Sequence, residues 1–136
     1  MTGKSPFLLG GALAGIALLA ACTPEPEEVS GRALFDQFCV SCHGNGGKGD
    51  GPAAADLATK PADLTRISAR NGGEFPLVRV MSTIDGYTRD ATVMPELGPA
   101  LADGPVEMVD TGGGVMTPTP SRLVALAEYL RSIQEP

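Results

Sequence analysis

The chain has 136 residues, of which 43% are hydrophobic, but it has no tryptophan and only 4% aromatic residues; it is long enough for one domain. Its 18 glycines and 12 prolines exceed average usage, so we expect a small core with long loops that folds around a metal, a disulfide or a cofactor. The net charge of −6 argues against binding to nucleic acid or anionic lipid by charge, and it is compatible with a partner that carries a basic docking patch.

Residues 1–21 are typical of a targeting signal. Lys4 supplies a positive charge, and residues 7–21 form an apolar run of 15 residues, shorter than the roughly 20 that a membrane-spanning helix needs. The run ends in "LAAC", which resembles the lipobox of bacterial lipoproteins. The resemblance implies cleavage before Cys22, lipidation of its thiol, and anchoring on the periplasmic side of a bacterial membrane. An uncleaved anchor and an ordinary cleaved signal are the alternatives.

A proline- and glutamate-rich stretch, "TPEPEEVS", follows the signal. It has almost nothing to bury, so residues 22–28 are expected to form a flexible acidic tether. The folded domain is then predicted to cover residues 29–136. Removal of residues 1–21 takes away Lys4 alone among the charged residues, which makes the mature protein one unit more negative than the precursor.

The first helix of the domain is predicted over 30–42. Ser30 is a plausible N-cap, and Leu34, Phe35 and Phe38 form an apolar face. Near its end lies "FCVSCHGNGGKGDG", which contains two of the three cysteines and the sole histidine of the chain.

The cysteines and the histidine in this stretch form the C-x-x-C-H signal for attachment of c-type haem. On a helical turn, Cys39 and Cys42 share one face, so each thiol can add to one of the two haem vinyl groups. His43 then projects over the ring, where a ring nitrogen can bind the iron from the proximal side. The sequence therefore predicts one covalently bound haem c.

Three other interpretations of these residues are weaker. A thioredoxin-like C-x-x-C motif would follow a βαβ pattern, and only a signal and a tether lie upstream. A zinc site needs four ligands, and no second cluster completes one. A structural disulfide is feasible in an exported protein, but one thiol for lipid and two for haem leave no cysteine over.

The glycines after His43 fit two nucleotide-binding patterns only superficially. Gly44, Gly46 and Gly49 match G-x-G-x-x-G, but that fingerprint must follow a strand and open a helix. Lys48 is followed by glycine and not by Ser or Thr, so a P-loop is excluded as well. We expect these glycines to let the backbone leave the helix through positive φ and pass close to a flat ligand.

The middle of the domain mixes loop and helix signals. Residues 52–70 are expected to contain short helical and loop segments. A helix is predicted over 75–84, ending at Gly86, because Leu77, Met81 and Ile84 share one face.

The sixth iron ligand must be a residue other than histidine, since the chain has one, and methionine is the usual alternative. Met81 lies on an apolar helical stripe, so core packing suits it better. Met108 and Met116 flank "DTGGG", a turn between two short extended runs. Met94 precedes Pro95, which favours extended geometry, so a loop can project its side chain inward. Met94 is the preferred candidate, with Met108 and Met116 as alternatives.

The last helix is predicted to begin near Thr119, with Pro120 at its first position. Its apolar stripe consists of Leu123, Leu126, Ala127, Leu130 and Ile133. The segment before it, residues 99–118, is expected to form a hairpin near 106–117 or a lid.

From Val29 onward, the chain resembles a small single-haem class I cytochrome c in the motifs "FCVSCHG", "MPELG" at 94–98 and "LVALAEYLRSI". The resemblance implies an all-α fold wrapped around the haem, with electron transfer as the activity, and it makes Met94 the distal ligand. It also implies that the first and last helices cross through Gly31, Phe35 and Tyr129. In that family a proline carbonyl holds the ligand histidine, and Pro52 and Pro61 are both candidates. Segment 99–118 is longer than in small members.

The sequence therefore predicts a membrane-tethered periplasmic electron carrier, not an enzyme, that serves redox partner proteins. A fixed haem subunit of a larger respiratory or dehydrogenase complex is the alternative. A haem enzyme or gas sensor with a labile sixth ligand is a further one, and a methionine ligand argues against it. We expect no nucleic-acid partner.

Overall fold

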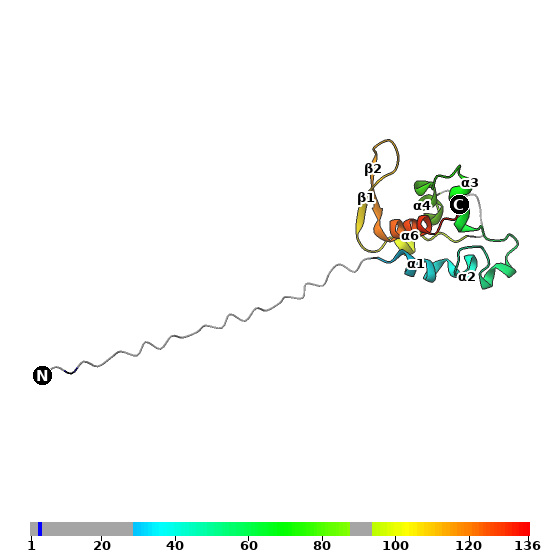
Figure 1. Cartoon of the computed structure of the whole chain (residues 1–136), viewed down its shortest axis with the longest axis horizontal. Coiled ribbons are helices and arrows are strands. Elements are labelled where there is room, and N and C mark those ends of the chain that lie inside the picture. Colours follow the sequence, from blue (N-terminus) through cyan, green and yellow to red (C-terminus); the bar gives the residue numbers. More distant parts are fainter. Residues whose placement is uncertain (1–2, 4–28, 88–93) are drawn as a thin grey trace.

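The structure, a computed structural model, describes residues 3, 29–87 and 94–136. The predicted signal over 1–21 (Gly3 apart), the tether over 22–28 and Cys22 lie outside these residues. The described chain forms a mainly α-helical domain with one β-hairpin at one end (Figure 1). This confirms the predicted mainly helical fold. None of the helices among the described residues is both long and apolar enough to cross a membrane.

Two consecutive helices, α1 (Gly31–Phe38) and α2 (Val40–His43), replace the single helix predicted over 30–42. Ser30 is the N-cap, as predicted, and its side-chain oxygen accepts a hydrogen bond from the Ala33 N–H at 3.2 Å. The break is slight, because the Cys39 N–H still donates to the Phe35 carbonyl at 2.9 Å. α2 ends where Gly44 adopts a φ of 76°.

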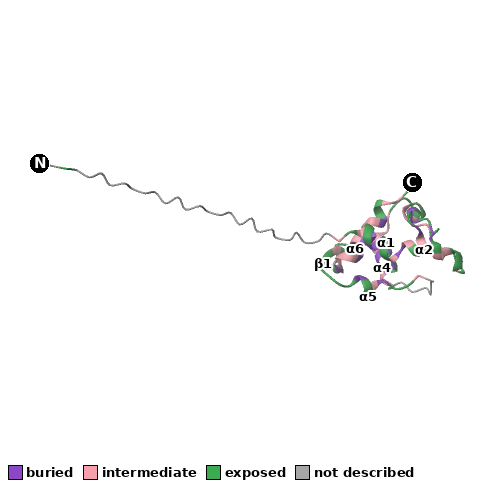
Figure 2. Cartoon of the chain, turned by 90° about the horizontal axis from the view of Figure 1, so that it is seen from below, coloured by how far each residue is buried: buried purple, intermediate pink, exposed green. Residues whose placement is uncertain are grey.

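Helix α1 crosses α6 (Ser121–Ser132) at close range (Figure 2). A Cβ on Gly31 would lie 2.0 Å from the Ala125 carbonyl oxygen, so only glycine allows this approach. The fully buried ring of Phe35 packs against Tyr129 with 5.2 Å between ring centroids, a favourable tilted arrangement. The predicted crossing through Gly31, Phe35 and Tyr129 is confirmed.

Helix α4 (Leu77–Asp85) packs on α6 and completes the core. It begins two residues later than predicted, after Pro76, and Gly86 ends it with a left-handed φ of 98°. The short helix α5 (Gly98–Leu101) adds Leu101 to the core and was not predicted. The buried positions of α6 include four of the five residues of the predicted stripe, with Val124 in addition: Leu123, Val124, Leu126, Ala127 and Leu130. The fifth, Ile133, follows the helix and is only partly buried.

The strands β1 (Val106–Asp110) and β2 (Met116–Pro120) form the predicted hairpin. Pro120 is not the first residue of the last helix. It ends β2 opposite Val106 in extended geometry, and the Ser121 N–H then donates to the Pro105 carbonyl at 2.9 Å. Because strand pairing continues to this point, α6 begins two residues later than expected.

Segment 52–70 contains only short helices, as predicted. They are the 3₁₀-helices η1 (Pro52–Asp56) and η2 (Leu64–Arg66), followed by α3 (Ile67–Arg70). The backbone between η1 and η2 runs beside the loop that leaves α2, and the Leu64 N–H donates to the Gly47 carbonyl at 2.6 Å. This contact brings residues 61–64 next to His43.

Candidate functional site

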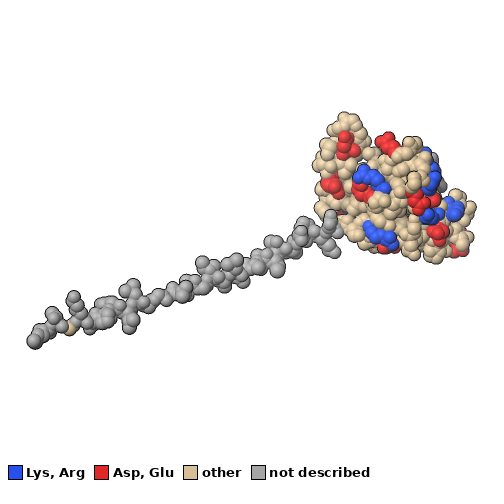
Figure 3. All heavy atoms as spheres, in the orientation of Figure 1, with Lys and Arg blue, Asp and Glu red and all other residues tan. Residues whose placement is uncertain are grey.

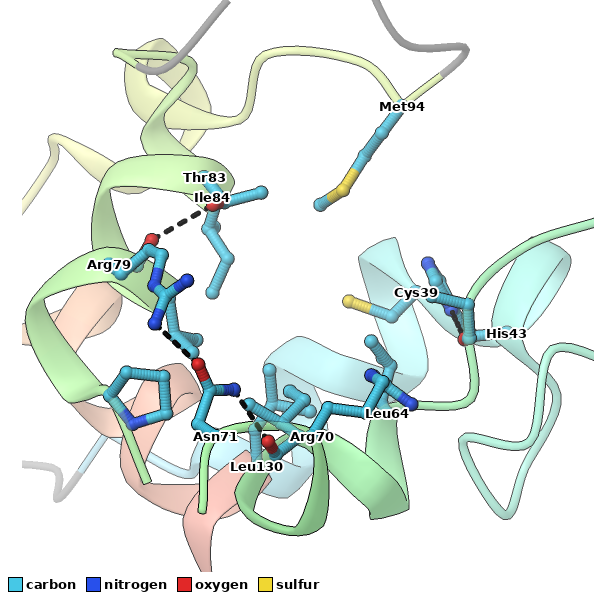
Figure 4. Close-up of a pocket in the computed structure, with 14 residues that line it drawn as sticks. Cys39, His43, Leu64, Arg70, Asn71, Arg79, Thr83, Ile84, Met94 and Leu130 are labelled. Carbon is cyan, nitrogen blue, oxygen red and sulfur yellow. Dashed lines mark hydrogen bonds between the residues drawn. The ribbon is translucent and has the colours of Figure 1, made fainter. Parts of the chain in front are cut away.

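A largely apolar cavity lies between α2, α3 and α4, and about 760 Å³ of it, open solvent at its mouth included, is free of protein atoms. Figure 4 shows Cys39, His43 and Met94 around one open space. The other lining residues are Ala62, Leu64, Ile67, Arg70, Asn71, Pro76, Arg79, Val80, Thr83, Ile84 and Leu130.

The α1–α2 junction places Cys39 and His43 in this cavity. Helical hydrogen bonds continue through the junction, since the His43 N–H donates to the Cys39 carbonyl at 2.8 Å and the Cys42 N–H to the same carbonyl at 3.2 Å. Cys39 is buried and lines the cavity, whereas Cys42 is half-buried one turn away and outside the lining residues.

The His43 ring is held by a backbone carbonyl, but the carbonyl belongs to neither predicted proline. Nδ1 of His43 donates to the Ala62 oxygen at 2.9 Å. Pro61 is the residue before, and Pro52 begins η1. The bond fixes the tautomer in which Nε2 carries the free lone pair, as a metal-binding histidine requires.

Gly49 allows residues 61 and 62 to come this close to His43. Its φ is 75°, and a Cβ there would lie 2.1 Å from the Pro61 carbonyl oxygen. Its N–H donates to the His43 carbonyl at 2.9 Å. Positive φ was expected for Gly44, Gly46 and Gly49, and it occurs at Gly44 and Gly49 but not at Gly46.

Both described cysteines are free thiols. Burial, and secondarily the neighbouring Cys42, raises the pKa of Cys39 to about 11. The thiol therefore stays protonated at neutral pH, unlike the thiolates of redox-active cysteines and zinc sites. Within the described ranges, no three His, Cys, Asp or Glu side chains gather as a metal site would need.

Four of the five methionines are described, and Met94 alone among them lines the cavity. It is partly buried, and its side chain points into the space from the segment that precedes α5 (Figure 4). Met81 is buried in the core, which confirms its packing role. Met108 and Met116 are 54% and 52% exposed on the hairpin, away from the cavity.

The sequence analysis missed four polar residues of the cavity: Arg70, Asn71, Arg79 and Thr83. Arg79 donates to the Asn71 side-chain oxygen, and Arg70 donates to the Asp63 carbonyl at 2.8 Å. Both arginines are exposed, so they place positive charge at the mouth of an apolar cavity. No local motif marks them, because the end of α3 meets α4 only in the fold, where Arg79 donates to Asn71.

These donors suit haem c. The cavity has apolar walls and contains the Cys39 thiol, a histidine with a fixed tautomer and a thioether, and the Cys42 thiol lies three residues on, outside the lining. This set matches the ligands of such a group. Haem also carries two carboxylates, which the exposed arginines at the mouth can pair with. The chemistry of these residues thus fits the group that the C-x-x-C-H motif predicted.

Comparison with known proteins agrees with this chemistry. The model of the family described as "Cytochrome C oxidase, cbb3-type, subunit III" matches residues 26–130. Searches of curated proteins and of solved structures returned no match. The family indicates covalent haem c, haem-based electron transfer rather than catalysis of its own, and typically a periplasmic location. The chain therefore belongs to the cbb3-type cytochrome c oxidase subunit III family and is a c-type cytochrome.

Proposed function

We propose that this protein is a membrane-tethered periplasmic electron-transfer protein that carries one haem c with histidine and methionine as axial ligands. Cys39 and Cys42 would form the two thioether bonds. His43 would bind the iron from the proximal side and Met94 from the distal side. Arg70 and Arg79 would pair with the haem carboxylates.

The observation that carries this proposal is the placement of Cys39, His43 and Met94 around one apolar cavity. Cys39 and His43 lie more than fifty residues before Met94 in the sequence, and folding brings all three to one cavity. The chain has no second histidine that could serve as the other ligand. The His43 tautomer is fixed by Ala62, so the nitrogen that faces away from this carbonyl is ready to bind metal.

When bound, haem supplies a reversible one-electron change at its iron. The protein's residues hold and tune it. The apolar wall of Leu64, Val80 and Ile84 excludes water from the ligands, and two permanent ligands leave no open position for a substrate. An iron that keeps both protein ligands in both oxidation states would suit electron transfer better than catalysis.

Covalent attachment can be tested by extraction with acidified acetone. Haem held by two thioether bonds should stay with the wild-type polypeptide, and Cys39→Ser or Cys42→Ser should weaken or abolish attachment. Met81→Leu, in the core but outside the cavity, serves as the control and should keep its haem. Free release of haem from the wild-type protein would overturn the proposed covalent attachment.

Tethering rests on the "LAAC" motif and on the acidic stretch behind it. We expect the mature chain to begin at lipidated Cys22, because acyl chains on one residue give stable anchoring when each buried methylene contributes about 0.8 kcal/mol. Cys22→Ser should remove the anchor. Mass spectrometry that finds Cys22 unmodified in a protein recovered from the soluble periplasmic fraction would contradict lipidation.

A second candidate is a fixed haem subunit of a larger respiratory complex. The family description, which names an oxidase subunit, favours it. Extraction in mild detergent distinguishes the two: a fixed subunit elutes as part of a large haem-containing complex in size-exclusion chromatography, whereas a free carrier elutes alone.

A further inference from the structure

The β1–β2 hairpin has its apolar face outward. Directly paired residues of an antiparallel sheet share a face, so Val106, Met108 and their partners Pro120 and Pro118 lie on one side. Met116, opposite Asp110, lies on the same side. Val106, Met108 and Met116 are 62%, 54% and 52% exposed. We call Val106, Met108, Met116 and Pro118 the outer hairpin face.

The opposite side of the hairpin is more polar, and except for the exposed Glu107 it faces the protein. Val109 packs against the core, Thr117 is half-buried and Thr119 is only 8% exposed. An antiparallel sheet with one solvent-exposed face ordinarily turns its apolar side to the core and its polar side to water. Here the arrangement is largely reversed, and a contiguous exposed apolar patch marks an interaction site.

The hairpin is well defined by its own hydrogen bonds. Asp110 accepts from the N–H groups of Gly112 and Gly114 at 2.8 and 3.2 Å, and the Thr111 N–H donates to the Val115 carbonyl at 2.9 Å. The outer hairpin face is therefore presented on a fixed turn, which lowers the entropy cost of binding.

The charged residues of the hairpin segment itself are all acidic: Asp110 lies on the same side as Met116, whereas Glu107 pairs with Thr119 on the other side, and Arg122 is the first basic residue after the segment. Segment 102–120 contains Asp103, Glu107 and Asp110 but no lysine or arginine, and in Figure 3 the hairpin shows acidic and uncharged atoms. Carboxylates beside an apolar strip disfavour an anionic bilayer, which attracts basic residues. They also disfavour a second copy of the hairpin, because like charges would meet. They complement a protein surface with an apolar strip bordered by Lys or Arg.

The hairpin lies at the opposite end of α6 from the cavity. Strand β2 leads directly into Ser121, and the cavity is lined by Leu130. Nine helical residues rise about 14 Å, so a partner seated on the hairpin leaves the cavity mouth at Arg70 and Arg79 open. This position suits a contact that holds the protein in place while electrons are exchanged elsewhere.

We propose that the outer hairpin face docks the protein onto a partner protein that presents an apolar strip bordered by basic side chains. The proposal rests on the electron-transfer function above, because it places the docking contact away from the haem. It makes the hairpin a holding surface and leaves the cavity end as the surface for electron exchange.

Kinetics with the partner in its natural setting test the docking surface. The probe is a mild-detergent extract of membranes from the source bacterium lacking this chain, which reoxidises the reduced full-length haem protein. The double variant Met108→Ser/Met116→Ser should raise the half-saturating concentration at least tenfold. The rate at saturation, the reduction potential and the optical spectrum should stay unchanged. Glu107→Lys should act in the same direction, and raised salt should weaken the wild-type interaction.

The matched control is Leu57→Ser, which removes a half-buried apolar side chain directly after η1, an element that packs on α2 and not on the hairpin strands. It should leave the half-saturating concentration unchanged. An equal rise in the half-saturating concentration of this control would indicate non-specific hydrophobic binding and would overturn the proposal. So would hairpin variants that bind as tightly as the wild type.

Photocrosslinking identifies the class of occupant without depending on electron transfer. A photoreactive residue at position 108 of the full chain in native membranes should give a protein adduct that raised salt or Glu107→Lys removes. An adduct with phospholipid alone, or with a second copy, would overturn the proposal. An intact adduct from a protein without the expected haem spectrum would contradict the proposed function but not the docking surface.

Discussion

Nδ1 of His43 donates a hydrogen bond to the carbonyl oxygen of Ala62 across 2.9 Å. The two residues are nineteen positions apart, and Gly49 joins their segments, because its backbone touches both. A carbonyl on the second nitrogen makes an imidazole a more basic metal ligand. The bond should therefore set both the orientation and the donor strength of His43.

Gly49→Ala should disturb this bond and raise the reduction potential. A Cβ would stand 2.1 Å from the Pro61 oxygen at a φ of 75°, so residues 61 and 62 must move away. A less basic His43 stabilises the oxidised iron less. Redox titration measures the shift. Gly46→Ala is the control, since its Cβ would meet nothing closer than Lys48 Cγ at 3.8 Å. Equal potentials in both variants and the wild type would contradict this role.

Gly31→Ala should destabilise the protein by about 1–3 kcal/mol, the usual cost of overpacking. The added Cβ would lie 2.0 Å from the Ala125 oxygen and 2.9 Å from Tyr129 Cβ, so α1 and α6 must separate. Urea unfolding of the haem-loaded protein gives the change. Gln37→Ala, on the exposed side of the same helix, should stay within about 0.5 kcal/mol of the wild type. A Gly31→Ala variant with the wild-type free energy of unfolding would show that the two helices can separate at no cost, and would contradict this prediction.

Asp63 should stabilise the protein in a pH-dependent way. Its carboxylate accepts from the Thr65 hydroxyl at 2.7 Å and from the Thr65 N–H at 2.9 Å, and the side-chain bond is the main cause that lowers its pKa below the usual 3.8. A lowered pKa means that the stabilisation is present above pH 3.8 and is lost as the pH falls through the folded-state value.

Asp63→Ala should therefore lower the free energy of unfolding by about 0.5–2 kcal/mol at pH 7, as the loss of a helix N-cap does. Urea unfolding from pH 7 to pH 2.5 should show the gap between variant and wild type closing at the acidic end. Asp56→Ala, at the exposed end of η1, is the control and should show a smaller gap at pH 7. A gap of constant size at every pH would argue against the role of the ionised carboxylate.

The helices that carry local signals were predictable from the sequence. Ser30 marked the start of α1, Gly86 the end of α4, and the stripe of α6 its buried side. The small helix α5 was missed because four residues are too few for a periodic pattern, and its placement depends on Leu97 and Leu101 finding the core. The start of α6 was misplaced because pairing with β1 holds Thr119 and Pro120 in a strand.

The site was predictable where its chemistry is local. The spacing of Cys39, Cys42 and His43 is sufficient by itself to predict the cofactor. The Ala62 carbonyl could not be found in this way, since any residue has one and only the fold selects it. Arg70 and Arg79 were missed for the same reason. The outer hairpin face was missed because alternation in Val106–Asp110 gives two faces but not which one turns to solvent.

The distal ligand is the central point of the account, since it separates an electron carrier from a haem enzyme or gas sensor. Met94 lines the cavity with Cys39 and His43, whereas Met116 is exposed on the hairpin. Replacing a methionine ligand removes a thioether that favours the reduced iron. Met94→Ala and Met116→Ala therefore form a matched pair.

The most direct measurement is redox titration of these two variants and the wild type, with absorption spectra recorded before and after addition of carbon monoxide. Met94→Ala should lower the potential, lose the weak sulfur-to-iron band in the far red of the oxidised protein, and bind carbon monoxide. Met116→Ala and the wild type should keep the band and exclude carbon monoxide. A Met94→Ala protein with the wild-type potential and spectrum, or a wild type that readily binds carbon monoxide, would contradict the account.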